Sequence, residues 1–257
     1  MRQGEDAPCV WCLVCGAAWV LCRELCGVIL TLPFSLSFFL QFYAGSTPAE
    51  QVPVWLEELG LEYIDLVLLH HPEGMPFGKC ASGTPAECRA NAWSQLSKLQ
   101  KTGVVKDLGV SNFNIRQINE LGSVEGGAAV AVNQIQYNAF APPRQDLLVK
   151  ECQAQGVAVT AWSSFQGTMM QHAGMFQQDT LKEIAAAKGR SVPQVLLRWA
   201  LQRGAAVIPG TGNPAHMDAN LAAYGFELSE ADMATISSIK NDPKADFPAT
   251  GFEVNES

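Results

Sequence analysis

The chain of 257 residues carries little charge, since Asp, Glu, Lys and Arg make up only 16% of it. Basic residues are the scarcer kind, with 17 against 25 acidic ones, and Arg2 and Arg23 are the only Lys or Arg residues before Lys79. A protein that binds a phosphate backbone over a broad surface concentrates basic residues there. The sequence therefore predicts no nucleic-acid partner. Its 48% hydrophobic content excludes a chain that is disordered throughout.

Cysteine is scarce outside the N-terminal segment. Five of the eight cysteines are Cys9, Cys12, Cys15, Cys22 and Cys26. The first three have the spacing of some metal sites, but their spacers are Val, Trp, Leu and Val and no histidine is near. We therefore interpret them as small hydrophobic residues and predict no metal site. The other three suggest no disulfide framework, and we expect a reducing compartment, the cytoplasm.

The N-terminal segment also lacks charge, because no charged residue occurs between Leu25 and Ala49. As a helix, residues 25–45 are long enough to cross a hydrocarbon core of about 30 Å. Against a membrane anchor, Pro33 interrupts the segment and no cluster of Lys or Arg flanks it. Two interpretations stay open: a membrane anchor or a segment packed on the core. We divide the chain into an apolar, cysteine-rich leader (1–46), a folded domain (47–240) and a C-terminal tail (241–257).

From about residue 50, strand and helix patterns alternate. Five short apolar segments have the composition of strands in a parallel sheet: "YIDLVLL", "VVKDLGV", "AVAVNQI", "VAVTAW" and "AAVIP". Amphipathic segments with helix caps separate them, such as the one that Asn114 can begin and those with capping boxes at Thr180/Glu183 and Ser191/Gln194. The alternation predicts an α/β fold with a parallel sheet.

Polar or small residues follow each predicted strand. They are His70 and His71, Ser111 and Asn112, Gln134 and Gln136, Trp162 to Ser164, and Gly210 with Thr211. A (β/α)8 barrel of the TIM type builds its active site from the carboxyl ends of its strands. A doubly wound dinucleotide fold would need Gly-x-Gly-x-x-Gly after its first strand, and the sequence has none. We predict a barrel of this type, of which five strand–helix units are recognisable.

The segment "IPGTGNPAHM" follows the last predicted strand. Its glycines allow close approach of a ligand, Asn213 can cap the next helix, and Pro214 suits the first helical position. Free backbone amides would then face an anion, which favours a phosphate site and a nucleotide ligand. An ordinary glycine-rich loop with a good cap remains the alternative.

These segments, in their order and spacing, resemble the aldo-keto reductase family. The resemblance rests on "LGLEYIDLVLLHHPEG", "GVVKDLGVSNFN", "AVNQIQYN", "GVAVTAWSSF" and "VIPGTGNPAHMDANL", and it covers about residues 50–240. It implies a monomeric barrel that binds NADP(H) and reduces a small carbonyl substrate, an aldehyde or ketone, by hydride transfer.

The resemblance also implies roles for individual residues. His70 matches the histidine that hydrogen-bonds the substrate carbonyl, and Ser111, Asn112 and Gln134 match the residues that hold the nicotinamide carboxamide. Trp162 stands where the family usually has a tyrosine stacked on the nicotinamide ring, and Ser163 begins the segment over the pyrophosphate. Thr211 and Asn220 match contacts of the adenosine half, where Gly210 and His216 replace a usual Lys and Arg. That replacement weakens the preference for NADP over NAD, because a neutral histidine offers less charge-assisted pairing.

The resemblance also implies that the barrel is incomplete, with its first three strand–helix units missing, and that the family's catalytic residues are incompletely represented. The resemblance implies a tetrad of Asp, Tyr, Lys and His, but no lysine precedes Lys79, and Tyr43 lies only 27 residues before His70. His70 is the sole member that we identify. Three hypotheses follow: a family derivative with little or no activity, an active reductase whose first 45 residues are mistaken, and a membrane-tethered protein that binds the cofactor without catalysis.

Overall fold

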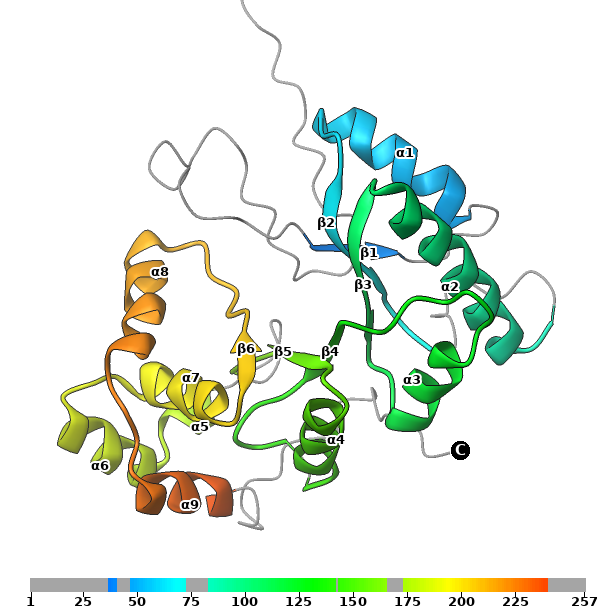
Figure 1. Ribbon diagram of the computed structural model, residues 1–257. Helices are drawn as coiled ribbons and strands as arrows, with labels where there is room; N and C mark the ends of the chain where they lie inside the picture. The colour runs from blue at the N-terminus through cyan, green and yellow to red at the C-terminus, as the bar shows by residue number, and fades with distance from the viewer. Residues whose placement is uncertain (1–36, 41–46, 73–82, 142, 166–172, 240–257) are drawn as a thin grey trace, which may run out of the picture.

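The computed structural model describes residues 37–40, 47–72, 83–141, 143–165 and 173–239. Strands and helices alternate along these residues (Figure 1). In chain order they are β1 (Ser37–Leu40), α1 (Pro48–Leu59), β2 (Ile64–Leu69), α2 (Pro85–Thr102), β3 (Val105–Ser111), α3 (Ile115–Gly122), β4 (Val132–Gln136), α4 (Pro143–Ala154), β5 (Ala158–Trp162), α5 (Ala173–Phe176), α6 (Asp179–Lys188), α7 (Val192–Gln202), β6 (Ala205–Val207), α8 (Pro214–Leu221), the 3-10 helix η1 (Ala222–Gly225) and α9 (Glu230–Ser238).

The described strands form one sheet in the order β1-β2-β3-β4-β5-β6, and every neighbouring pair is parallel. Because parallel strands run the same way, their carboxyl ends meet at one edge of the sheet. The register aligns Leu69 with Val110, Ser111 with Gln134, and Gln136 with Trp162. Residues predicted to follow different strands are thus brought to the same level of the sheet.

The five predicted strands and the α/β fold are confirmed, and the structure adds a sixth strand. This strand, β1, lies inside the predicted leader and pairs in parallel with β2. At residues 37–40 the apolar segment is therefore extended, whereas a membrane anchor would be helical. The described residues do not include the rest of residues 25–45, the cysteine-rich start or the tail. Within the described part of the chain, no helix is both long and apolar enough to span a membrane.

Most predicted helix ends are confirmed. Asn114, Ser191 and Asn213 each accept a hydrogen bond from a backbone amide in the first turn of the following helix. The capping box at Thr180 is wrong, because α6 begins at Asp179 after Gln178, which places Thr180 inside the helix. The start of α6 thus lies two residues earlier than the Thr/Glu pair indicates.

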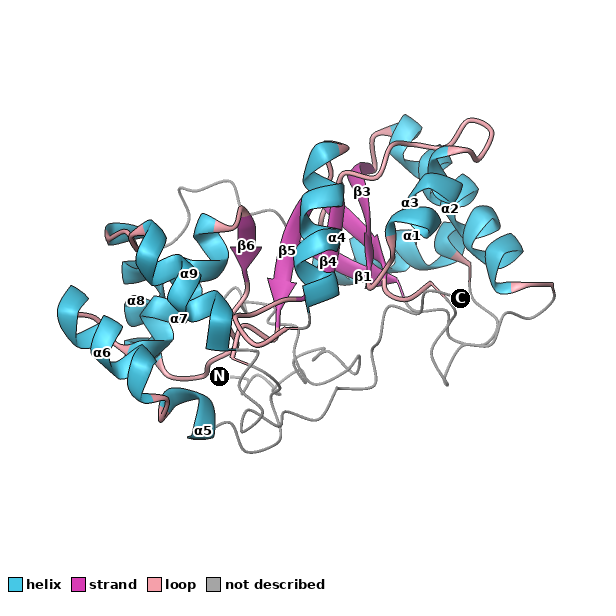
Figure 2. Ribbon diagram, turned by 90° about the horizontal axis from the view of Figure 1, so that it is seen from below, coloured by secondary structure: helices cyan, strands magenta, loops and turns pink. Residues whose placement is uncertain are grey.

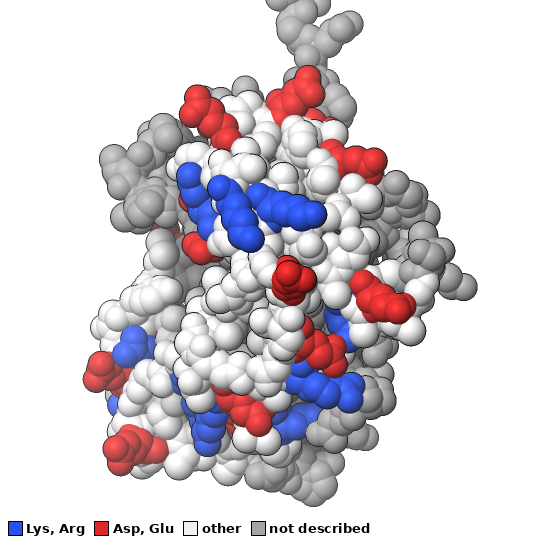
Figure 3. Space-filling model, turned by 45° about the vertical axis from the view of Figure 1, so that its right-hand side comes forward, with Lys and Arg blue, Asp and Glu red and all other residues white. Residues whose placement is uncertain are grey.

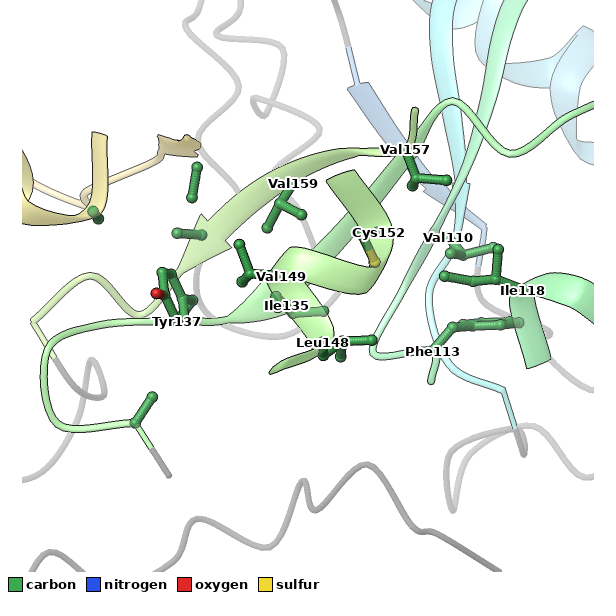
Figure 4. Packing of buried hydrophobic residues seen from close by; sticks show 14 of the residues in the cluster. Val110, Phe113, Ile118, Ile135, Tyr137, Leu148, Val149, Cys152, Val157 and Val159 are labelled. Carbon is green, nitrogen blue, oxygen red and sulfur yellow. The ribbon is translucent and has the colours of Figure 1, made fainter. Parts of the chain in front are cut away.

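Helices cover the sheet in two groups. In Figures 1 and 2, α1, α2 and α3 lie beside β1 to β3, while α5 to α9 gather on the side of β6. Apolar side chains of strands and helices form a continuous core between them (Figure 4). In its middle, Val110 and Ile135 of the sheet meet Ile118 of α3 and Leu148 of α4, and all four side chains are at most 6% exposed. Burial of this size is the main favourable contribution to folding.

One cysteine departs from expectation. Cys88, in the first turns of α2, is disulfide-bonded, whereas the sequence suggested no disulfide framework. Cys152 of α4 is fully buried as a free thiol, in keeping with the interpretation of cysteine as a small hydrophobic residue.

On the surface, acidic and basic side chains lie interspersed over the face shown in Figure 3.

Candidate functional site

The carboxyl ends of β2 to β5 bring together the first group of predicted site residues. We call this group the sheet-edge cluster; it consists of His70, His71, Ser111, Asn112, Gln134 and Trp162. These residues lie at or near the carboxyl ends of four successive parallel strands. Hydrogen bonds through side chains or backbone carbonyls link all six, as described next. The structure therefore joins residues that are up to 92 positions apart in the chain, from 70 to 162.

Asn112 is the centre of the sheet-edge cluster. Its Nδ2 lies 3.1 Å from the carbonyl oxygen of His70, 3.3 Å from His71 Nδ1 and 3.1 Å from Ser111 Oγ. Its Oδ1 accepts a hydrogen bond of 3.2 Å from the indole Nε1 of Trp162. The backbone has a φ of 64°, in the left-handed region that Asn tolerates better than most residues. Asn112 thus links the ends of β2, β3 and β5.

The two histidines lie against each other at the end of β2. Their ring centroids are 4.1 Å apart and the rings are tilted by 38°. Burial, together with the neighbouring His71, lowers the pKa of His70 to about 3, and burial lowers the pKa of His71 to about 4. Both imidazoles are therefore neutral at pH 7. A neutral imidazole can donate a hydrogen bond to a ligand oxygen, but it is a poor source of a proton.

Ser111 and Gln134 lie side by side on β3 and β4. The hydroxyl of Ser111 donates to the carbonyl oxygen of Gln134 at 2.8 Å, and both side chains are at least 93% buried. The side-chain amide of Gln134 makes no hydrogen bond within the described part of the chain. Its amide atoms are not fully buried, so they are open to solvent and can form hydrogen bonds with a ligand.

The segment after β5 is held in an unusual conformation. Ser163 has a φ of 56°, and its carbonyl oxygen accepts a hydrogen bond of 3.0 Å from Asn138 Nδ2. Trp162 and Ser163 are both partly exposed, while Ser164 is buried. The left-handed backbone of Ser163 changes the direction of the chain directly after the strand, and such backbone outliers often occur at functional sites.

We did not predict a role for Asn138 from the sequence. Its position two residues after β4, at another polar strand end, is the signal that could have indicated it.

The second group of predicted residues lies between β6 and α8; we call it the β6–α8 cluster. It consists of Gly210, Thr211, His216 and Asn220. Thr211 Oγ1 lies 3.3 Å from His216 Nδ1 and accepts a hydrogen bond from the amide of Asn213. Gly210 and His216 are exposed, and Thr211 and Asn220 are partly exposed. Within the described residues, no hydrogen bond or ion pair joins this cluster to the sheet-edge cluster, so the two are separate groups.

The backbone amides at the start of α8 differ from the expectation. The amide of Ala215 donates to Asn213 Oδ1, and the amides of His216 and Met217 donate to the carbonyl oxygen of Asn213. These amides and that of Asn213 are therefore satisfied within the protein, because the helix cap uses them. An anion here would depend on the side chains of Thr211 and His216 rather than on free amides at these positions.

A parallel sheet covered by helices, with polar side chains converging at the carboxyl ends of its strands, defines the class of α/β proteins that bind ligands at that edge. The family follows from comparison: residues 48–241 match the model of the aldo/keto reductase family. The chain belongs to the aldo/keto reductase family. The predicted resemblance is thus confirmed.

Individual relatives agree with this assignment. The chain is 33% identical to the (1S)-1,7-diacetoxy-luvungin A aldo-keto reductase of Citrus sinensis, over 72% of this chain and 59% of that protein. It is also 33% identical to the NAD(P)H-dependent D-xylose reductase of Scheffersomyces stipitis, over 73% of this chain and 67% of that protein. The matched region thus spans about three-fifths to two-thirds of these relatives.

Solved structures show the same barrel-type fold. The crystal structure of aldose reductase from Giardia lamblia matches with a TM-score of 0.67 and 27% identity, over 80% of this chain and 71% of that one. The predicted fold class is therefore confirmed, with the parallel strands of the chain superposing on part of a reductase barrel.

Proposed function

We propose that this chain binds a nicotinamide dinucleotide at the carboxyl edge of its sheet and that it has little or no reductase activity. The nicotinamide half would bind at the sheet-edge cluster with Ser163, and the adenosine half at the β6–α8 cluster. The relative from Scheffersomyces stipitis is described as NAD(P)H-dependent, which supports this class of cofactor. The substrate would be a small aldehyde or ketone.

The observation that carries the proposal is the side chain of Gln134. Its residue is 93% buried, and its amide makes no hydrogen bond in the described structure but still reaches solvent, beside Ser111 and Asn112. A carboxamide ligand offers the complementary donor and acceptor. Ser111 Oγ and Asn112 Oδ1 each also have a lone pair left after the contacts described above, since a hydroxyl or carbonyl oxygen can accept two hydrogen bonds. The residues present therefore fit the group.

The residues of the cluster favour orientation over proton transfer. A bound nicotinamide would supply a hydride to the carbonyl carbon. The neutral imidazole of His70 would donate a hydrogen bond to the carbonyl oxygen and hold it in place, while the indole of Trp162 would offer an aromatic face. Neither His70 nor His71 is protonated at pH 7, because their pKa values are lowered to about 3 and about 4.

The expectation of low activity rests on the catalytic tetrad, of which we identify only His70. A positioned general acid contributes roughly 100-fold to 10,000-fold to such a reaction. This chain has no lysine before Lys79 to lower the pKa of a tyrosine, and Tyr43 lies outside the described residues. We therefore expect that the chain binds the cofactor but turns over carbonyl substrates at least about 100-fold more slowly than a reductase with the full tetrad.

The binding half of the proposal is tested by titrating the purified chain with NADPH and NADH and measuring the change in cofactor fluorescence. Gln134→Met should weaken binding about 5-fold to 10-fold, the effect of losing one or two hydrogen bonds. The control is Gln100→Met, which removes a hydrogen bond to the carbonyl oxygen of Lys106 at the amino end of β3. Equal affinity of the Gln134→Met variant and the unaltered chain would refute the assigned role of Gln134.

The catalytic half is tested separately with a panel of aldehydes and NADPH. Robust turnover by this chain would overturn the proposed loss of activity and support the second hypothesis, an active reductase, without affecting the binding result. Recovery of the chain in a membrane fraction after carbonate washing would favour the third hypothesis, a tethered binding protein.

A further inference from the structure

The loops at the carboxyl edge share a structural device. In three of them, a backbone carbonyl accepts a hydrogen bond from a side chain of a neighbouring element. The pairs are Pro72 O with Arg89 Nη1 at 2.9 Å, Phe113 O with Asn133 Nδ2 at 2.9 Å, and Ser163 O with Asn138 Nδ2 at 3.0 Å. Each carbonyl lies within two residues of a member of the sheet-edge cluster. The loops that carry the cluster are therefore anchored from outside it.

Arg89 is the charged member of the three anchoring side chains. It lies on α2, is 7% exposed, and donates through Nη1 to Pro72, the residue directly after His71. Through Nη2 it pairs with Glu120 of α3 at 2.7 Å, and Glu120 also faces Arg116 at 3.8 Å. The guanidinium thus ties the histidine segment to two helices at once, which its planar, multi-donor shape suits.

Two anchors keep a buried polar atom without a partner. In the described part of the chain, the buried side-chain atoms that lack a hydrogen bond are Arg89 Nε and Asn133 Oδ1. Leaving such atoms unpaired costs free energy. Both atoms belong to side chains that anchor loops of the sheet-edge cluster. Each side chain therefore keeps its hydrogen bond to a loop carbonyl while another of its polar atoms stays without a partner.

We propose that Arg89 is a positioning residue that holds the His70–His71 segment from the helix side, while Asn112 holds it from the sheet side. Asn112 contacts the carbonyl of His70 and the ring of His71, and Arg89 contacts the carbonyl of Pro72. Three consecutive residues are thereby fixed by two side chains from different elements. The functional meaning of this arrangement rests on the proposed cofactor site, but the structural effect does not depend on it.

The test follows the imidazole NMR signals of the ligand-free chain of 257 residues, which has four histidines. Arg89→Met should move the signals of His70 and His71, assigned with His70→Gln and His71→Gln variants, and raise their pKa values by about one unit as the rings become more hydrated. Arg89→Lys keeps the charge and can still donate to one partner, so it should restore part of the effect. Trp93→Phe is the matched control, since it removes a buried hydrogen bond from the same helix to Ala128.

The expected pattern is a change in Arg89→Met, a smaller change in Arg89→Lys, and none in Trp93→Phe. Unchanged histidine titration in folded Arg89→Met, or an equal change in Trp93→Phe, would overturn the proposal. If Arg89→Met fails to fold, Arg89→Lys is compared with Glu120→Gln, which leaves the hydrogen bond from Arg89 to Pro72 in place. A change in histidine titration only in Arg89→Lys supports the proposal, and any other pattern overturns it. Failure of the unaltered chain to bind NADPH would remove the cofactor site but leave this result standing.

Discussion

The sheet-edge cluster and the β6–α8 cluster are built in opposite ways. In the first, Ser111, Asn112 and Gln134 are at most 8% exposed and are linked across several strands. In the second, Gly210 and His216 are exposed, and the contacts join residues at most five positions apart. The comparison indicates that the nicotinamide end of the proposed site is preorganised by the core, while the adenosine end depends on individual surface side chains.

The largest expected effect is on stability at the sheet-edge cluster. Asn112→Ala should lower the free energy of unfolding by about 3 kcal/mol, because it leaves buried donors and acceptors unpaired. Asn112→Gly should cost about 1 kcal/mol less than Asn112→Ala, since glycine readily adopts the φ of 64°. Urea unfolding measures both.

The counterpart beside the β6–α8 cluster is Asn213→Ala, which removes the side-chain cap of α8 between Thr211 and His216. Because this position is exposed, the loss should be no more than about 1 kcal/mol. An equal loss in Asn112→Ala and Asn213→Ala would contradict the contrast between a buried and a surface-built cluster.

The next effect is the response of stability to acid. The pKa values of His70 and His71, about 3 and about 4, lie below the ordinary value, so the unfolded chain binds protons more readily than the folded one. This contribution to stability is present above about pH 6.5 and is lost as the pH falls toward 4 and then 3. We expect a loss of about 2 kcal/mol, allowing for the partial exposure of both rings.

Urea unfolding between pH 7 and pH 4 checks this, with His71→Gln as the variant in which the slope should be smaller. His216→Gln is the control, since it alters an exposed histidine of the other cluster. The assignment would be contradicted if His216→Gln reduced the pH dependence of the free energy of unfolding as much as His71→Gln does.

The smallest effect is on the choice of cofactor. His216→Arg should strengthen binding of NADPH about 10-fold relative to NADH, because arginine pairs with a phosphate through charge-assisted hydrogen bonds. Stability should hardly change, since His216 is exposed. Parallel titrations with the two cofactors measure the ratio, and an equal gain for both would show that His216 does not face the 2'-phosphate.

Local sequence patterns predicted the elements well and the contacts less well. The five strands, the caps at Asn114, Ser191 and Asn213, and the strand-end position of the site residues all follow from local periodicity and chemistry. β1 was missed because an uncharged apolar segment reads equally well as a strand or a membrane helix. We expected the first backbone amides of α8 to be free, but the side chain and carbonyl of the capping residue Asn213 accept their hydrogen bonds.

Long-range partners were beyond sequence patterns. Nothing in the spacing indicates that Arg89 contacts Pro72, that Asn138 holds the carbonyl of Ser163, or that Trp162 donates to Asn112. These pairs are 17, 25 and 50 positions apart. Their geometry depends on how helices pack on the sheet, which side-chain periodicity does not encode.

The sequence by itself determined the alternation of strands and helices, the polar strand ends and the resemblance to the reductase family, because these depend on local hydrophobic period, helix caps and residue order. Only the tertiary structure decided which of those polar groups are already paired and which remain available. The pairing of Asn112 and the unpaired amide of Gln134 result from the register of parallel strands and from burial, and both arise only when distant segments are packed together.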